Sequence, residues 1–349
     1  MELSGETVKV LQNGSCSVEI DLFGGAIAKF CVHGEDINPL SFRLPAEQMP
    51  ENNKSGAPYQ GYFLCLGRWG RPSVGEIKAG MPDHGQLTNI LWEAEDSGPM
   101  KLEMRAFSPM EGPHVNRSIE LSRNSPLYMV SEEVHNTNTL GRLNNMVQHP
   151  TLDQPFLDRA TVVNCNAQAG YDHSFGVERE MYASSWLIGL CKDMTAIDLI
   201  APQKEYSSVF SYLVKMTDKM GWVTAYYPTH NLLLGYIWKR TDYPRIILWQ
   251  DWLGSSIRYR GIEFRTTGIH KPFKQIISDG DWKVFGKNSC EYIDAAEKSC
   301  RKHLSFLCEV KPGFKGVNEI YYSNGDVIIE DQVSGQNIEL SMNPGFDKP

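Results

Sequence analysis

The sequence predicts an all-β protein that folds as a large sandwich of two β-sheets. Short segments in which apolar and polar residues alternate recur along most of the chain, and Gly, Pro and Asn turns separate them. Helical periodicity is scarce before residue 290. Many short strands joined by such turns are typical of a sandwich or a barrel, and the large number of segments favours a two-sheet sandwich. The 349 residues exceed the usual single-domain size, but an all-β architecture can use this length as one domain.

Residues 7–32 are expected to form a β-meander. Apolar and polar residues alternate on both sides of a turn at Asn13-Gly14, and the pattern continues after Gly24-Gly25. Residues 33–60 are rich in Pro, Asn, Gly and charge and show no period, so we expect a long surface loop there. Loops of this length are usually functional or mobile.

Further strands, one helix and one hairpin are expected after this loop. The helix is predicted near Cys290–Phe306, where apolar residues recur at helical spacing. The Ser-Asn-Gly-Asp sequence within residues 319–330 predicts the hairpin. We therefore expect a sandwich domain over residues 1–285 and a C-terminal extension, 286–349, whose helix and hairpin pack on it. The strands are expected near residues 102–106, 115–121, 128–134, 161–164, 232–239 and 246–249.

Charge and cysteine content exclude several classes of protein. The net charge of −8 argues against nucleic-acid binding, which needs clustered Lys and Arg. The chain has no signal-like start and no apolar run that approaches the about 18 residues of a membrane span, so we expect a cytoplasmic protein without a membrane partner. Its eight cysteines are scattered without a C-x-x-C pair, which predicts reduced and mostly buried thiols.

The stretch from Trp249 to Thr267 contains the first candidate catalytic residue, Glu263. If residues 256–265 form a strand, alternation places Ile262 and Phe264 on the core face. The opposite face then carries Tyr259, Gly261, Glu263 and Arg265. A glycine there lets a ligand approach the backbone, and Glu263 becomes the candidate base. The alternative is a solvated glutamate that pairs with Arg265 or with a neighbour across the ladder.

Two earlier motifs could hold a ligand. In the segment LGRWGRP, Arg68 and Arg71 bracket Trp69 and Gly70, and an arginine beside an aromatic ring can bind a sugar by forked hydrogen bonds and stacking. The same pair can equally be solvated loop residues. His84 precedes Gly85 in a turn that leads into a strand, where a lone histidine can also be structural.

His149 is the second candidate catalytic residue. Pro150 follows it and holds it in an extended conformation, which fixes where the ring points. Histidine is the side chain best placed to act as an acid or a base near neutral pH. The sequence contains no metal-ligand spacing, nucleophile elbow, phosphate-binding loop or dinucleotide fingerprint, so we expect no obligatory metal and no cofactor. This inventory favours acid/base chemistry on a neutral polar ligand.

Four motifs occur in an order that resembles the aldose 1-epimerase (galactose mutarotase) family. They are Gly67-Arg68, His84-Gly85 followed by Trp92-Glu93, His149-Pro150, and Glu263 within GIEFRTTG. The resemblance covers roughly residues 7–285. The family folds as a β-supersandwich and interconverts the α and β anomers of free sugars without a cofactor. It usually has a substrate-binding aspartate well before the catalytic glutamate, and the corresponding region, Tyr206–Met216, offers none.

The resemblance implies a role for each matching residue. Glu263 would take the proton of the C1 hydroxyl, and His149 would protonate the ring oxygen. Ring opening of a hemiacetal needs these two transfers on opposite sides of the C1–O5 bond, and positioned acid/base pairs typically supply about 10²–10⁴-fold. The substrate contacts that we expect are Arg68, His84, Arg71, Trp249, Asp251 and Arg265.

Three functional hypotheses follow. The first is a mutarotase-like isomerase that acts on a monosaccharide as a monomer or homodimer. The second is a catalytically silent sugar-binding domain. The third, a retaining glycosidase, needs a second carboxylate about 5–5.5 Å from Glu263, and only Asp251 or Glu93 is available for it. A neutral sugar is favoured over an acidic one, although Arg71 is then left without a role.

Overall fold

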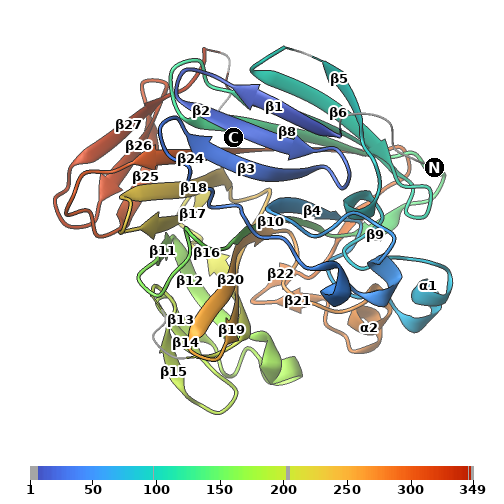
Figure 1. Ribbon diagram of the computed structural model, residues 1–349. Coiled ribbons are helices and arrows are strands. Elements are labelled where there is room, and N and C mark those ends of the chain that lie inside the picture. The colour runs from blue at the N-terminus through green and yellow to red at the C-terminus, as the bar shows by residue number, and fades with distance from the viewer. Residues whose placement is uncertain (1–6, 97, 202–204, 345, 347–349) are drawn as a thin grey trace.

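The computed structural model describes residues 7–96, 98–201, 205–344 and 346, and two large antiparallel sheets dominate it (Figure 1). Among these residues the larger sheet has ten strands. In spatial order they are β1 (Val8–Gln12), β2 (Cys16–Asp21), β3 (Ala26–Val32), β4 (Tyr62–Leu66), β10 (Met146–Leu152), β20 (Ser256–Arg265), β19 (Arg245–Leu253), β16 (Ser208–Val214), β12 (Ala167–Asp172) and β13 (Ser184–Ser185).

The second sheet has eight strands within the described residues and packs against the first. Its spatial order is β11 (Val162–Cys165), β17 (Met220–Tyr227), β18 (Leu232–Lys239), β24 (Lys298–Glu309), β8 (Leu127–Asn136), β7 (Pro113–Leu121), β6 (Lys101–Phe107) and β5 (Glu93–Asp96). The predicted meander and the six predicted strands all coincide with strands of these two sheets, which confirms them.

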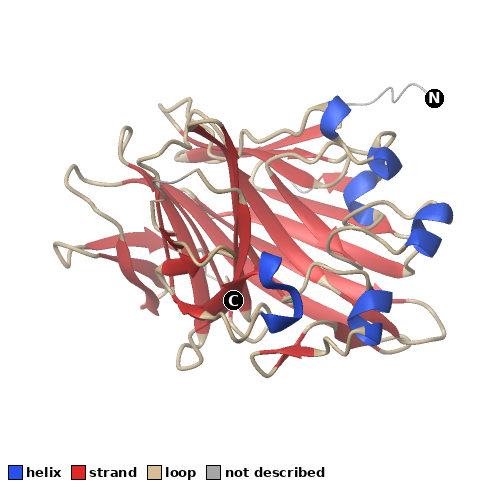
Figure 2. Cartoon of the chain, turned by 90° about the horizontal axis from the view of Figure 1, so that it is seen from below, coloured by secondary structure: helices blue, strands red, loops and turns tan. Residues whose placement is uncertain are grey.

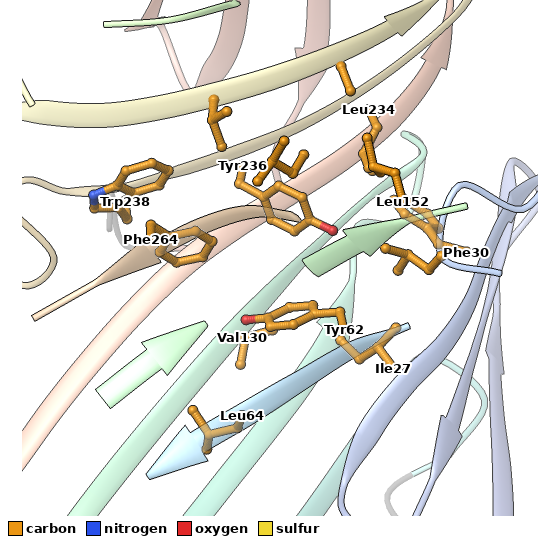
Figure 3. Close-up of a cluster of buried hydrophobic side chains, with 14 of the residues drawn as sticks. Ile27, Phe30, Tyr62, Leu64, Val130, Leu152, Leu234, Tyr236, Trp238 and Phe264 are labelled. Carbon is orange, nitrogen blue, oxygen red and sulfur yellow. The ribbon is translucent and has the colours of Figure 1, made fainter. Parts of the chain in front are cut away.

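The core lies between the two sheets, where aromatic and aliphatic side chains from both interdigitate (Figure 3). Phe264 of β20 stacks on Trp238 of β18 with ring centroids 4.3 Å apart. Tyr62 of β4 meets Tyr236 of β18 edge to face at 5.7 Å. Because Phe264 faces this core, alternation turns Glu263 to the outer face of the ten-stranded sheet, as the sequence predicts.

The prediction of a helix at Cys290–Phe306 is wrong. This segment forms β23 (Glu291–Ile293) and then β24, which pairs with β18 on one side and β8 on the other. From residue 303 to residue 308 both faces of β24 are buried, because Leu307 faces the main core while Leu304 and Phe306 face a second apolar cluster. A strand buried on both faces shows no alternation, so apolar residues at helical spacing misled the prediction. Residues after 285 therefore supply a central strand.

The predicted hairpin within residues 319–330 is confirmed and belongs to a three-stranded sheet, β25 (Val317–Ser323), β26 (Asp326–Asp331) and β27 (Asn337–Ser341). This small sheet covers part of the outer face of the eight-stranded sheet (Figure 1). It buries the second apolar cluster, which includes Leu233, Leu304, Phe306, Val327 and Ile329.

The helices are short, and most of them gather along one side of the strands (Figure 2). None of the described helices is both long and apolar enough to cross a bilayer. The remaining elements are α1 (Val74–Lys78), α2 (Phe273–Ser278), η1 (Ala46–Gln48), η2 (Glu51–Asn53), η3 (Leu87–Asn89), η4 (His173–Glu178), and the strand pairs β9 (Arg142–Asn144) with β23, β14 (Ile188–Leu190) with β15 (Ala196–Asp198), and β21 (Lys283–Val284) with β22 (Lys287–Asn288).

Candidate active site

A cavity of about 280 Å³ lies on the outer face of the ten-stranded sheet. Strands β4, β10, β20 and β19 are consecutive neighbours there, and each contributes a side chain to its lining. The predicted loop of residues 33–60 supplies much of the rest. The lining consists of Phe42, Leu44, Gln48, Pro50, Tyr59, Phe63, Trp69, His84, His149, Val209, Trp249, Glu263 and His270.

Glu263 and His149 are brought together by the register of β20 and β10. Val147 pairs with Arg265 and Thr151 pairs with Gly261, so the residues midway between these pairs face each other on the same side of the sheet. His149 Nε2 lies 3.3 Å from Glu263 Oε1. The structure thus joins the two candidate catalytic residues, which are 114 positions apart in the chain (263 − 149).

The Glu263 carboxyl is almost entirely buried. Burial raises its pKa to about 7, against an opposing effect from the Arg265 charge. Its second oxygen, Oε2, is buried and makes no hydrogen bond within the described part of the protein. A buried, unpaired acceptor is costly for the fold, and such groups cluster at functional sites.

The ring of His149 is fixed on three sides. It stacks on Phe63 with centroids 4.3 Å apart, and Nδ1 forms a hydrogen bond of 3.0 Å with Thr151 Oγ1. Burial lowers the pKa of His149 well below its usual value, and the neighbouring His84, Arg265 and His270 lower it further. The imidazole is therefore neutral near pH 7, and Nε2 is the nitrogen that points at Glu263.

His84 lies in the cavity wall in a left-handed backbone conformation, with φ of 64°. Its Nδ1 accepts a hydrogen bond of 3.3 Å from the Gly70 N–H and lies 3.2 Å from Cys65 Sγ. Burial lowers the pKa of His84 to about 4, so the ring is neutral and its proton is on Nε2. His84 can therefore donate one hydrogen bond to a ligand.

Arg265 lies behind the cavity wall and is fully buried. Its guanidinium carbon lies 3.4 Å from the ring centroid of Trp69, and Trp69 itself lines the cavity. Burial lowers the pKa of Arg265, while the Glu263 carboxylate raises it. Arg265 therefore acts on the electrostatics of Glu263, and the expected direct contact with substrate is not supported by this position.

Three other expected contacts lie outside the cavity lining. Arg68 is buried in ion pairs with Glu111 at 3.2 Å and Glu76 at 3.0 Å, so its hydrogen-bonding fork is already occupied. Arg71 is exposed. Asp251 pairs with Arg258 at 2.7 Å on a neighbouring strand. By contrast, Trp249 does line the cavity, where Phe42 packs against it edge to face at 6.2 Å.

His270 is the main residue of the site that the sequence analysis missed. It packs on Trp69 with ring centroids 4.3 Å apart, and burial lowers its pKa to about 3. The signal for it is Gly70, because a Cβ atom there would lie only 1.8 Å from His270 Nε2. Only the folded chain reveals this contact, since 200 positions separate the two residues (270 − 70).

The described residues contain no group of three or more His, Cys, Asp or Glu side chains that could hold a metal ion. None of the eight cysteines, all of which the structure describes, forms a disulfide; seven are buried and Cys300 is exposed.

Structural comparison finds the same fold in other proteins. A galactose mutarotase related enzyme from Lactobacillus acidophilus matches with a TM-score of 0.62 and 13% identity, over 87% of this chain and 99% of that chain. A putative aldose 1-epimerase from Escherichia coli K12 matches with a TM-score of 0.61 and 14% identity, over 88% and 100%. An aldose epimerase homologue from C. elegans matches with a TM-score of 0.59 and 11% identity, over 87% of this chain and 99% of that chain.

These likenesses establish the fold as that of the aldose 1-epimerase and galactose mutarotase-like proteins, an all-β sandwich. At the level of the fold, they confirm the resemblance to this family that the four sequence motifs indicate. No protein-family model matches the sequence, and no curated protein matches it closely.

Proposed function

We propose that this protein is a mutarotase-like isomerase that interconverts the anomers of a cyclic hemiacetal sugar by acid/base catalysis. The observation that carries the proposal is the contact between Glu263 and His149 in a cavity large enough for a small ligand, with Glu263 Oε2 unpaired. Two groups of different acidity within reach of one reacting centre are what ring opening of a hemiacetal requires.

The pair works with one exchangeable proton. Burial raises the pKa of Glu263 and lowers that of His149, so at rest the proton belongs on the carboxyl. The residue that holds the proton gives it to the ring oxygen, while its partner takes the proton of the C1 hydroxyl. When the ring closes again on the other face of C1, the two transfers run in reverse and the pair is restored.

The roles that the resemblance implies, Glu263 as base and His149 as acid, place the proton on His149 when the ring opens. The resting electrostatics support the opposite distribution. Both distributions occur within each turnover, so the two assignments differ only in which residue faces the C1 hydroxyl. In either case His84 donates from Nε2 to a substrate hydroxyl, and Phe63 holds the His149 ring in place.

A retaining glycosidase is disfavoured because its second carboxylate is missing. Glu263 is the one carboxylate among the described residues that line the cavity. Asp251 is engaged with Arg258, and Glu93 is exposed on the other sheet, where it pairs with Arg105.

Exchange spectroscopy tests the proposal. Proton NMR of an aldose at anomeric equilibrium is recorded with and without the protein, and the rate of magnetisation transfer between the α and β C1 protons is measured. An isomerase increases this rate in proportion to protein concentration. A silent sugar-binding domain broadens or shifts the sugar signals and leaves the exchange rate at its spontaneous value.

A further inference from the structure

The Nδ1 side of the His149 ring faces Thr151, which lies two residues further along β10. Because successive side chains of a strand alternate between its faces, Thr151 shares the outer face of the ten-stranded sheet with His149. Its side chain is fully buried, and Oγ1 lies 3.0 Å from His149 Nδ1. The Thr151 main-chain N–H donates to the Gly61 carbonyl oxygen at 3.0 Å. Strand pairing therefore fixes where this hydroxyl meets the imidazole.

The atoms around Nδ1 favour a proton on that nitrogen. Burial lowers the pKa of His149, and a hydrogen bond to its own carbonyl oxygen acts in the opposite direction. Thr151 Oγ1 lies 3.5 Å from the same carbonyl oxygen. A carbonyl oxygen can only accept, whereas a hydroxyl both donates and accepts. With a proton on Nδ1, the ring donates to Oγ1 and the hydroxyl donates to the carbonyl. With a bare Nδ1, the hydroxyl must donate to the ring, and its bond to the carbonyl is lost.

The Nε2 side of the ring favours the same tautomer. Nε2 lies 3.3 Å from Glu263 Oε1. Burial raises the pKa of Glu263 to about 7 and lowers that of His149 well below its usual value, so below pH 7 the proton of this pair belongs on the carboxyl. A carboxyl O–H donates to Nε2 only if Nε2 is bare, and in a neutral imidazole a bare Nε2 means a proton on Nδ1. The two sides of the ring therefore agree.

We propose that Thr151 is a positioning residue that holds His149 with its proton on Nδ1, so that the bare Nε2 is the first proton acceptor of the reaction. The inference rests on the proposed function and fixes the order of proton transfers within it. Glu263 gives its proton to the ring oxygen as the C1–O5 bond breaks. Nε2 takes the proton of the C1 hydroxyl as the carbonyl of the open-chain aldehyde forms.

This order reverses the roles that the family resemblance implies, in which His149 is the acid. Once the ring has opened, the pair consists of a His149 imidazolium and a Glu263 carboxylate. Thr151 then stabilises the imidazolium, because Oγ1 accepts from the positively charged Nδ1–H. Ring closure on the other face of C1 returns one proton to the C1 oxygen and one to Glu263, so no proton is gained or lost.

Nitrogen NMR of the protein labelled with ¹⁵N-histidine tests the tautomer without any sugar. A bare imidazole nitrogen and a protonated one give well-separated signals, and the His149 signals are identified by their loss in His149→Gln. Below the pKa of Glu263, we expect a protonated Nδ1 and a bare Nε2 in the wild type and in Thr151→Ser. Thr151→Val keeps the shape of the side chain but removes the acceptor, so the population with its proton on Nε2 should rise. A wild-type ring protonated on Nε2, or a Thr151→Val spectrum identical to that of the wild type, overturns the proposal.

Anomer exchange of glucose, galactose and xylose tests the catalytic part of the proposal. Loss of a hydrogen bond to a charged group should lower kcat of Thr151→Val roughly 10- to 150-fold at nearly unchanged KM, and Thr151→Ser should restore it.

Thr161→Val is the matched control for Thr151→Val. Thr161 is also buried, and its hydroxyl donates to the Phe156 carbonyl oxygen at 3.1 Å and accepts from the Asp158 N–H at 2.9 Å, outside the cavity lining. A Thr151→Val variant that keeps the kcat of this control overturns the catalytic part of the proposal. If the wild type accelerates the exchange of none of these sugars, the proposed function fails, whereas the nitrogen spectra still decide the tautomer.

Discussion

The imidazole of His149 lies flat against the phenyl ring of Phe63, its ladder partner on β4, with an angle of 20° between the planes. On its other side His149 meets Glu263 of β20. Phe63, His149 and Glu263 lie side by side on the neighbouring strands β4, β10 and β20. This row therefore sets the position, the tilt and the partner of the imidazole. Because strand register fixes all three, the contact between His149 and Glu263 depends little on the loops that surround it.

Replacement of the carboxylate tests the pair directly. Glu263→Gln keeps the shape of the side chain but removes its acid/base capacity, so anomer exchange should fall by about 10²–10⁴-fold. Exchange spectroscopy measures the rate, and circular dichroism checks the fold. Glu319→Gln, on the exposed side of β25, is the control. A Glu263→Gln variant that keeps more than about a tenth of the wild-type rate contradicts the assignment.

Sequence patterns predict those features of this protein that depend on neighbours along the chain. Two-residue alternation in β20 is local, so the outward direction of Glu263 follows from Ile262 and Phe264 alone. Which side chains of β24 face the core does not follow from its neighbours along the chain, because the C-terminal sheet buries the face that would otherwise be polar. Alternation was lost there, and the helix prediction failed for that reason.

The candidate site divides in the same way. Glu263 and His149 are candidates from the sequence because each carries a local signal, but their contact depends on the pairing of β20 with β10. Arg68 lies beside an aromatic residue, as a sugar-binding arginine often does. Its ion-pair partner Glu111 lies 43 positions away in the chain (111 − 68), so the sequence gives no sign that the guanidinium is already engaged. His270 carries no local signal that separates it from an ordinary loop histidine.

Arg68 is expected to contribute to stability. Arg68→Met leaves the fully buried Glu111 carboxylate without its ion pair, which should lower the free energy of unfolding by about 3–5 kcal/mol. Arg71→Met, at an exposed position, should change it by no more than about 0.5 kcal/mol. Urea unfolding gives both values. A large rise in KM for Arg68→Met at unchanged stability would instead restore the substrate contact that the sequence predicts.

Gly70 is expected to control the position of His270. Its φ is +83°, and a Cβ atom would lie 1.8 Å from His270 Nε2, so Gly70→Ala must strain the backbone and displace the ring. We expect anomer exchange to fall at least tenfold, with a loss of stability of about 1–2 kcal/mol. Gly75→Ala is the control, since nothing lies within 4 Å of its added methyl group. Equal activity in the two variants would show that His270 has no part in catalysis.

Mild acid should destabilise the protein. Burial lowers the pKa of a set of histidines, to about 4 for His84 and about 3 for His270. Below pH 6.5 the unfolded chain takes up protons that the folded protein excludes, so stability present above pH 6.5 is lost as pH falls toward these values. Each such histidine contributes up to about 1.4 kcal/mol per pH unit. Their full set is His84, His149, His173, His270 and His303.

Urea unfolding at pH 7.5, 6.5 and 5.5 measures this effect. The free energy of unfolding should be lower at pH 5.5 than at pH 6.5, and His84→Asn should make the decline shallower. Equal stability at these two pH values would mean that the histidine pKa values are not depressed in the folded protein.

Glu263 should act in the opposite direction, because its pKa is raised in the folded state from 4.5 to about 7. Its contribution to stability is complete below pH 4.5, where the carboxyl is protonated in both states, and is lost as pH rises to about 7. The shift corresponds to about 3 kcal/mol. Glutamine carries no charge at any pH. The free energy of unfolding of Glu263→Gln should therefore rise by this amount relative to that of the wild type between pH 4 and pH 8. A stability difference that does not change with pH would show that the carboxyl titrates normally and is no acid/base group poised near neutrality.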